Sequence, residues 1–233
     1  MDKRKSISHH TCECACKAKK QYCIQTVPIF QSLTAEQMGK VHSLIHRKQF
    51  FHGEMIYRPG EIADSFYFLK SGKLRVYRLS ETGKEQLVRM VNQNEFTGEL
   101  ALFKKGVYEA FAQAQSDCSI CAIRHEDFRE LLLEHPSISI EMLGAITNRL
   151  STSEQQTAWA TTETVRNRLL HFLMSLVDSA EKEPIVELNM AKKDLASYLG
   201  TTSESLSREL TWLEKEKIIE EIAYGKFKLL NIL

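Results

Sequence analysis

The cysteines of this chain are unevenly distributed, and most of them fall in one short segment. Four of the six lie near the N-terminus in the polar stretch HHTCECACKAKKQYC, namely Cys12, Cys14, Cys16 and Cys23. In a reducing compartment, clustered cysteines bind metals, undergo redox reactions or act as nucleophiles more often than they form structural disulfides. The segment therefore indicates a chemical role, and the remaining cysteines, Cys118 and Cys121, are further candidates for it.

Three kinds of thiol chemistry fit this pattern. Four thiolates are the ligand set of a cubane iron–sulfur cluster, and such a centre would order a polar segment that has no core of its own. A zinc site with four cysteines uses the same residue types. A switch between thiol and disulfide needs no metal, and it would join Cys118 to Cys121 or one of the N-terminal cysteines to Cys121. The residues alone leave all three open.

The rest of the composition limits the classes to which the chain can belong. Its 233 residues, 26.8 kDa and 43% hydrophobic content suffice to bury a core without disulfides, as one large domain or two small ones. It has no apolar run of the roughly 18 residues that a membrane span needs, and its start, MDKRKSISHH, lacks the apolar stretch of a secretory signal. We expect a cytoplasmic protein without a membrane partner. Because no motif pairs a nucleophile with a base, we expect no enzyme activity.

Residues 50–123 alternate short runs of β-branched and aromatic residues with glycine turns. The stretch SFYFLKSGKLRVYRLSETGKEQLVRMV contains two such turns, KSGK and SETGK, at the spacing of successive hairpins. This pattern predicts an all-β domain in the form of an antiparallel barrel or sandwich.

From Glu126 onward the pattern becomes helical. The stretch HEDFRELLLEHP predicts a short helix, and residues 137–160 contain no glycine or proline except Gly144, which predicts a long one. A further amphipathic helix, TVRNRLLHFLMSLVDSA, precedes the acidic, proline-containing break EKEPIVELN. The residues after this break are predicted to form a separate small domain.

The segment DLASYLGTTSESLSREL carries the most specific local signal. Its first half places Leu195, Ala196 and Leu199 on one helical face, and a second helix follows Gly200 and the capping residues TTS. Two helices joined by a tight glycine turn predict a helix-turn-helix, whose second helix can enter the major groove of DNA. The stretch IIEEIAYGKFKLLNI then predicts a hairpin that turns at Gly225, which makes this a winged version.

The start of the second helix has the chemistry to recognise DNA bases. Its exposed side chains are predicted to be Ser203, Glu204, Ser207 and Arg208. Arginine bonds guanine with two donors, glutamate accepts from cytosine, and serine bonds a base edge or a phosphate. Lys192 and Lys193, at the start of the first helix, are better placed for phosphates. Since the net charge is only +1, binding must depend on this local arrangement. The alternative is an ordinary helical hairpin with a solvated polar face.

The order of these elements resembles the Crp/Fnr family of bacterial transcription regulators over nearly the whole chain. The resemblance rests on FFHGEMIYRPGEIADSFYFLKSGKLRVYRLSETGKEQL, FTGELALF and DLASYLGTTSESLSREL. It implies an α+β fold with an N-terminal antiparallel β-barrel, the jelly roll of cyclic-nucleotide-binding domains, then a long dimerisation helix and a C-terminal winged helix-turn-helix. It also implies a homodimer that binds double-stranded DNA and contacts RNA polymerase. The implied parts are a cysteine-rich arm (1–25), the barrel (26–135), the dimerisation helix (136–162) and the DNA-binding domain (163–233).

Within the family, single positions distinguish cyclic-nucleotide binders from redox sensors. After the GEL motif, cyclic-nucleotide binders carry an arginine and a serine or threonine that bind the cyclic phosphate. This chain has Glu109 and Ala110 at those places, and Glu109 would set an anion against the phosphate. We therefore expect no cyclic nucleotide. Gly98, Glu99 and Leu100 are then expected to form a barrel turn with a buried carboxylate.

The redox-sensing branch fits the cysteines. The stretch AFAQAQSDCSICAIRHEDF resembles the Fnr segment that supplies the barrel ligand, which corresponds to Cys121, and SESLSR resembles the Fnr base-contact pattern. The resemblance implies a [4Fe-4S] cluster bound by Cys121 and three N-terminal cysteines. The N-terminal spacing, C-x-C-x-C-x₆-C, departs from the Fnr arrangement, which has two and five residues between its ligands. We select as ligands Cys14, Cys16, Cys23 and Cys121, with Cys12 as the alternate. Zinc, or no metal, is the alternative.

The long helix is expected to carry the dimer contact. Its apolar stripe is short and consists of Met142, Leu143, Ile146 and Leu150. Such a seam is marginal by itself, so a cofactor could shift the balance between dimer and monomer with only a few kcal/mol. The alternative is that some of these four residues pack on the barrel instead.

Overall fold

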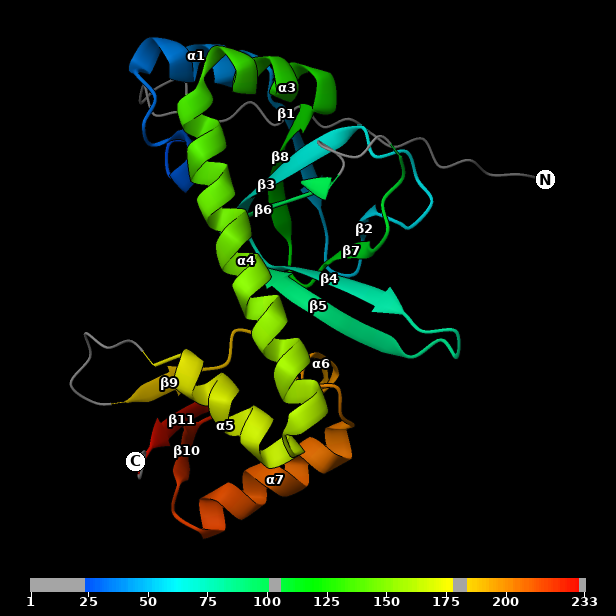
Figure 1. The fold of residues 1–233 in the computed structure, drawn as a ribbon, viewed down its shortest axis with the longest axis vertical. Coiled ribbons are helices and arrows are strands. Elements are labelled where there is room, and N and C mark those ends of the chain that lie inside the picture. Colours follow the sequence, from blue (N-terminus) through cyan, green and yellow to red (C-terminus); the bar gives the residue numbers. More distant parts are fainter. Residues whose placement is uncertain (1–23, 101–105, 178–183, 231–233) are drawn as a thin grey trace. The chain divides into compact units, whose positions relative to one another are not determined.

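The computed structural model describes residues 24–100, 106–177 and 184–230, which form two compact units (Figure 1). The N-terminal unit runs to Arg78 and resumes over Arg89–Ile146. The C-terminal unit contains Leu79–Val88 and the chain from Thr147 onward. The predicted ligands Cys14, Cys16 and Cys23, and the alternate Cys12, lie outside the described residues.

The predicted β domain is confirmed, as two open four-stranded sheets rather than a closed barrel. Its strands are β1 (His46–Phe50), β2 (Met55–Tyr57), β3 (Ser65–Ser71), β4 (Leu74–Leu79), β5 (Glu85–Val91), β6 (Phe96–Thr97), β7 (Phe111–Ala114) and β8 (Cys118–Arg124). One sheet has the order β1-β8-β3-β6 and the other β2-β7-β4-β5. Strand β8 pairs antiparallel with both β1 and β3, so it lies inside its sheet.

The KSGK turn between β3 and β4 depends on its glycine. Gly72 has a φ of 94°, in the left-handed region that residues with a Cβ rarely adopt. A Cβ there would also lie 2.5 Å from the carbonyl oxygen of Asp117 and 2.6 Å from the sulfur of Cys118. The predicted turn therefore brings the β3–β4 connection against the start of β8.

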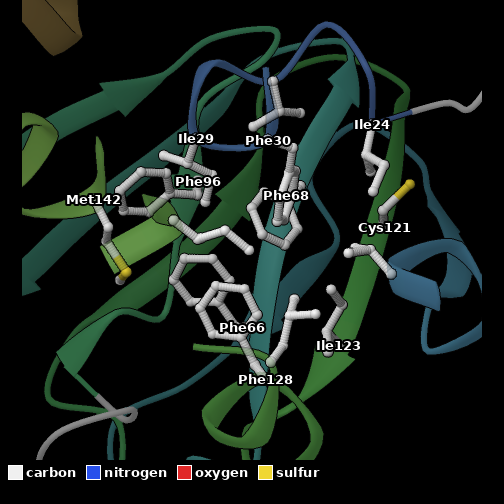
Figure 2. Close-up of a cluster of buried hydrophobic side chains, with 14 of the residues drawn as sticks. Ile24, Ile29, Phe30, Phe66, Phe68, Phe96, Cys121, Ile123, Phe128 and Met142 are labelled. Atoms are coloured by element: carbon white, nitrogen blue, oxygen red, sulfur yellow. The ribbon is translucent and has the colours of Figure 1, made fainter. Parts of the chain in front are cut away.

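An aromatic cluster fills the core beside the β1-β8-β3-β6 sheet. The rings of Phe66 and Phe128 stack at 4.6 Å between centroids, and those of Phe30 and Phe68 lie 5.0 Å apart (Figure 2). The helical elements that contribute buried residues are η2 (Pro28–Phe30), α1 (Ala35–Ser43), α3 (His125–Glu134) and the start of α4 (Pro136–Thr162). Cys121 belongs to the same cluster. The core therefore joins the first described residues to strand β8, far along the chain.

The C-terminal unit contains the predicted winged helix-turn-helix. Its elements after α4 are α5 (Val165–Ser175), β9 (Ile185–Glu187), α6 (Lys192–Tyr198), α7 (Ser203–Lys215), β10 (Ile219–Ala223) and β11 (Lys226–Leu229). The wing is a three-stranded sheet in the order β10-β11-β9, in which β9 comes from the stretch interpreted as a break. None of the helices in the described part of the chain is long and apolar enough to cross a membrane.

Candidate nucleic-acid interface and cysteine site

Helix α7 separates an apolar face from a polar one. Leu206, Leu210 and Leu213 are at most 5% exposed and pack in the core of the C-terminal unit. The four predicted base-contact residues are all exposed: Ser203, Glu204, Ser207 and Arg208. Because residues three and four apart share a helical face, they form one continuous patch at the start of α7. The structure thus brings together the side chains that the sequence selected.

The turn before α7 fixes where this patch begins. Gly200 has a φ of 66°, which ends α6, and Thr202 caps α7 by accepting a hydrogen bond from the Ser205 backbone N–H at 3.2 Å. Within the patch, the Ser207 hydroxyl donates to the Ser203 carbonyl at 2.9 Å. The helix therefore starts at a defined residue, and its first two turns face solvent.

A residue that sequence reasoning missed holds α7 in place. Arg166, on α5, donates from Nε to Glu209 at 2.8 Å, and its guanidinium lies 3.4 Å from the ring centroid of Trp212. Glu209 and Trp212 both belong to α7. An arginine that pairs with an acid and stacks on an aromatic ring fixes one helix against another. The signal in the sequence was an arginine in an amphipathic helix, which by itself names no partner.

The two lysines predicted to contact phosphate are both paired with acids. Lys192 lies 3.4 Å from the Glu221 carboxylate, and its ammonium is 5.6 Å from the ring centroid of Tyr224 in the wing. Lys193 lies 3.8 Å from Glu85 and its side chain is 77% exposed. Both lysines are at the start of α6, as expected. Their role toward phosphate stays a prediction.

Cys121 is a buried thiol on the central strand β8. It is 1% exposed, and it stands opposite Arg47 of β1 and Phe68 of β3 in the sheet register. Figure 2 shows its sulfur beside Ile24, the first described residue, and both belong to one core cluster. Ile24 follows Cys23 directly in the sequence. The site of Cys121 is therefore next to the point where the cysteine-rich segment joins the fold.

Cys118 differs from Cys121 in both neighbours and chemistry. Its thiol donates to the Lys73 and Ser116 carbonyls at 3.3 and 3.0 Å, and burial raises the pKa of the Cys118 thiol. It belongs to a second core cluster, to which strands of both sheets contribute. In a strand, positions three apart point to opposite faces and are roughly 10 Å apart, whereas a disulfide needs Cα atoms within about 7 Å. A Cys118–Cys121 disulfide is therefore incompatible with strand β8.

The four predicted seam residues on α4 differ in exposure. Met142 is 2% exposed and packs in the aromatic core, whereas Leu143 and Leu150 are 62% and 57% exposed and Ile146 is half-buried. Ile140, which the prediction omitted, is 69% exposed. An exposed apolar stripe on α4 thus runs through Leu143 and Leu150, and a contact with a second chain stays a prediction.

The position corresponding to the phosphate-binding segment is occupied by ion pairs. Glu99 pairs with Arg89 at 3.1 Å, with both side chains about one-fifth exposed, so its carboxylate is largely buried. Glu109 pairs with Arg78 at 2.9 Å on the surface. Arg89 also donates to the Thr97 hydroxyl at 3.2 Å. The arginines here are bound to carboxylates of the chain itself, and no spacing along the chain identifies these two pairs.

Metal-ligating residues are dispersed in the part of the chain that the structure describes. Residues 24–100, 106–177 and 184–230 contain no group of three or more His, Cys, Asp or Glu side chains placed to hold a metal ion. Cys118 and Cys121 are not joined to each other by a disulfide.

Known families match both units of the chain. The cyclic nucleotide-binding domain family matches residues 47–135, and the Crp-like helix-turn-helix domain family matches residues 167–232. The Probable transcriptional regulator flp of Lacticaseibacillus casei is 32% identical over 198 residues, which cover 85% of this chain and 90% of that protein. The Cyclic AMP receptor protein of Thermus thermophilus is 26% identical over 213 residues, covering 85% and 97%.

Solved structures share the fold. A CooA mutant from Carboxydothermus hydrogenoformans superposes with a TM-score of 0.74 at 20% identity, over 88% of this chain and 91% of that one. FixK2 from Bradyrhizobium japonicum gives a TM-score of 0.68 at 21% identity, over 80% and 93%. At such identities the likeness establishes the arrangement of elements.

Proposed function

The chain belongs to the Crp/Fnr family of transcription regulators, and from this premise we propose that it senses oxygen or redox state through a [4Fe-4S] cluster. The proposed ligands are Cys14, Cys16, Cys23 and Cys121, with Cys12 as the alternate. The cluster state would control dimerisation and, through it, binding to palindromic TTGAT-like DNA sites. DNA binding and the regulator class follow from the family, and the sensing chemistry is the new element.

The observation that carries this proposal is the shared core of Ile24 and Cys121. Strand β8 holds the Cys121 thiol at the end of the cluster where the chain enters from the cysteine-rich segment (Figure 2). Cys23, one of the proposed ligands, is adjacent to Ile24 in the sequence. Ile24 and Cys121, which are about a hundred positions apart in the chain, lie in one core cluster.

The donor set also fits such a centre. Iron–sulfur cubanes are ligated by four thiolates, and the cysteines of this chain supply them without a carboxylate or imidazole. Cys121 lies in an apolar environment that limits access of solvent, which is a setting typical of redox centres. Cys118 is excluded from the set because it bonds to two carbonyls on the other face of β8.

The bound cluster would supply a linkage that oxygen or oxidants can break. While the ligand set is complete, the N-terminal segment is held to β8 at Cys121. When it is incomplete, the segment is released and the environment of the N-terminal core changes. Helix α4 begins in that core through Ile138 and Met142 and continues with the exposed Leu143 and Leu150. A small change in this core can therefore shift a marginal association of α4 with a second chain.

We also propose that the chain binds no cyclic nucleotide. Arg78 and Arg89, the cations near the proposed phosphate position, are paired with Glu109 and Glu99. Ala110 offers no hydroxyl. A cyclic phosphate would have to displace Glu109 and Glu99 from these arginines, and it would find no hydroxyl donor at position 110. Isothermal calorimetry with cyclic AMP is expected to give no heat of binding, and micromolar affinity would contradict this.

Purification under anaerobic conditions tests the cluster. We expect brown protein with about four irons and four sulfides per chain, the composition of a cubane. Exposure to air should bleach the colour and shift the sedimentation profile toward monomer. Colourless protein with stoichiometric zinc would establish the zinc alternative, and metal-free protein with a disulfide between Cys121 and an N-terminal cysteine would establish a thiol switch. RNA polymerase is the expected partner at promoters, and in vitro transcription from a TTGAT-bearing promoter tests it.

A further inference from the structure

The tip of the β4–β5 hairpin contacts the first helix of the helix-turn-helix. The tip, residues 79–88, belongs to the same compact unit as α6 and α7. On α6, the Ser197 hydroxyl donates to the Glu85 carbonyl at 2.8 Å and accepts from the Leu87 backbone N–H at 2.7 Å. The Gln86 side chain donates to the Ser197 carbonyl at 3.4 Å. One serine thus binds three consecutive residues of the hairpin.

An ion pair lies on the same face of α6. Lys193 stands four residues before Ser197, which places the two side chains one helical turn apart on one face. The Lys193 ammonium is 3.8 Å from the Glu85 carboxylate. Leu87, whose backbone N–H bonds Ser197, is 3% exposed. The tip therefore engages this face with two short hydrogen bonds and a carboxylate.

In this contact a carboxylate lies beside Lys193, where a DNA phosphate is predicted to lie in a complex. Lys193 is a predicted phosphate contact, and a carboxylate at 3.8 Å offers it the same charge that a phosphate would. A surface ion pair is weak by itself, because solvent screens it and both side chains lose freedom. The Ser197 hydrogen bonds fix the backbone of Glu85 and so keep its carboxylate near the lysine. Glu85 is therefore an intramolecular competitor that DNA must displace.

We propose that the hairpin tip is a built-in inhibitor of DNA binding, in which Glu85 occupies Lys193 in place of a DNA phosphate and Ser197 holds it there. Ser197 is a positioning residue that acts through Glu85. The competition concerns one ammonium group, so it affects all DNA sequences alike. It is independent of the cysteines and of any cluster.

Substitution of Glu85 by Gln tests the competition directly in the full chain. We expect the Kd for a specific duplex and for a scrambled duplex to fall by the same factor, about 3- to 10-fold at low salt, because Lys193 gains a phosphate contact. The slope of log K against log salt should steepen by about 0.9, the value for one more phosphate contact on B-DNA. Ser197→Ala should act in the same direction, with a circular dichroism spectrum and unfolding midpoint that confirm an intact fold.

Two controls separate this competition from a general change of charge. Glu81→Gln removes the same charge from the exposed turn of the same hairpin, so it measures the long-range effect alone. In a Lys193→Gln background, Glu85→Gln should tighten binding no more than Glu81→Gln does. The proposal is overturned if Glu85→Gln and Glu81→Gln change the Kd equally in the native background, or if the effect of Glu85→Gln persists without Lys193. It is also overturned if Ser197→Ala weakens DNA binding, because the hairpin tip would then stabilise the DNA-binding form.

Discussion

Helix α7 and strand β8 carry the side chains on which the proposed function rests, and they present them differently. The base-contact patch of α7 is exposed and comes from six consecutive residues, Ser203 to Arg208. Cys121 on β8 is 1% exposed and meets the start of the described chain only through the packed core. A surface that reads DNA needs only local helical periodicity. A buried ligand site needs the whole tertiary fold, so its partners cannot be deduced from spacing along the chain.

The largest expected effect is on metal content, because cluster assembly is close to all-or-none. Cys121→Ser should lose nearly all of the iron of anaerobically purified protein, since the proposed ligand set loses its one member on strand β8. Cys118→Ser is the matched control on the same strand, and it should retain about four irons per chain because its thiol bonds carbonyls on the opposite face. Iron and sulfide analysis checks both. Equal losses in the two variants would show that β8 folding, rather than ligation, sets the iron content.

The next effect concerns the exposed patch. Arg208→Ala should cost about 1–3 kcal/mol per half-site, because an arginine that bonds guanine with two donors is lost. Discrimination should relax mainly at one guanine of the TTGAT-like site. Fluorescence anisotropy with duplexes substituted at each position measures this. If specific and scrambled duplexes lose affinity equally, Arg208 contacts the backbone, and the orientation of α7 on DNA differs from the one proposed.

Local signals in the sequence were enough to predict the elements and the exposed patch at the start of α7. Glycine turns at KSGK and at Gly200, the leucine spacing of α7 and the Gly225 hairpin each depend on neighbouring residues alone, and each is found in the structure. The long helix was predicted over 137–160 and spans Pro136–Thr162. The predicted fold class is confirmed, and the strands form two open sheets, a detail that depends on pairing between distant strands.

Side-chain contacts between different elements could not be predicted from the sequence. The pairs Arg89–Glu99 and Arg166–Glu209 join residues whose types are common on any surface, so no motif identifies them. The burial of Met142 has the same origin. A helical stripe gives the apolar face of α4, but only the packed core decides which of its residues are covered inside one chain. Ser197 likewise has no signature, because its partners are backbone atoms of another element.

A third prediction concerns the buried tyrosines of the N-terminal unit and the stability of the fold at alkaline pH. Burial raises the pKa of Tyr57 from 10.0 to about 12, although its hydrogen bond with Thr97 acts in the other direction. A raised pKa means that the folded state keeps a proton that the unfolded state loses, so this stability is complete below pH 10 and disappears as pH rises toward 12. At about 1.36 kcal/mol per pKa unit, roughly 2–3 kcal/mol is lost.

Comparison of wild type with Tyr57→Phe measures this loss. The variant should be somewhat less stable at pH 8, because the buried Thr97 loses a partner, yet it should lose less unfolding free energy between pH 8 and pH 11.5. Urea unfolding followed by circular dichroism gives both values. Tyr67 and Tyr108 also have pKa values raised by burial, so part of the alkaline loss should persist in the variant. An identical loss in both proteins would contradict the assignment to Tyr57.

The smallest expected effect compares helix caps in the two units. Thr202 caps α7, and Thr34 caps α1 in a capping box with Gln37. Replacement of either threonine by alanine should cost about 1 kcal/mol, because a backbone N–H loses its acceptor. Both tryptophans of the chain, Trp159 and Trp212, lie in the C-terminal unit, so tryptophan fluorescence follows the unfolding of that unit alone. Thr202→Ala should therefore shift the urea midpoint seen by fluorescence, whereas Thr34→Ala should leave it unchanged and lower only the circular dichroism transition of the N-terminal unit. If Thr34→Ala moves the fluorescence midpoint equally, the two units unfold together. The difference between the exposed patch of α7 and the buried site of Cys121 would then not extend to the stability of the units that hold them.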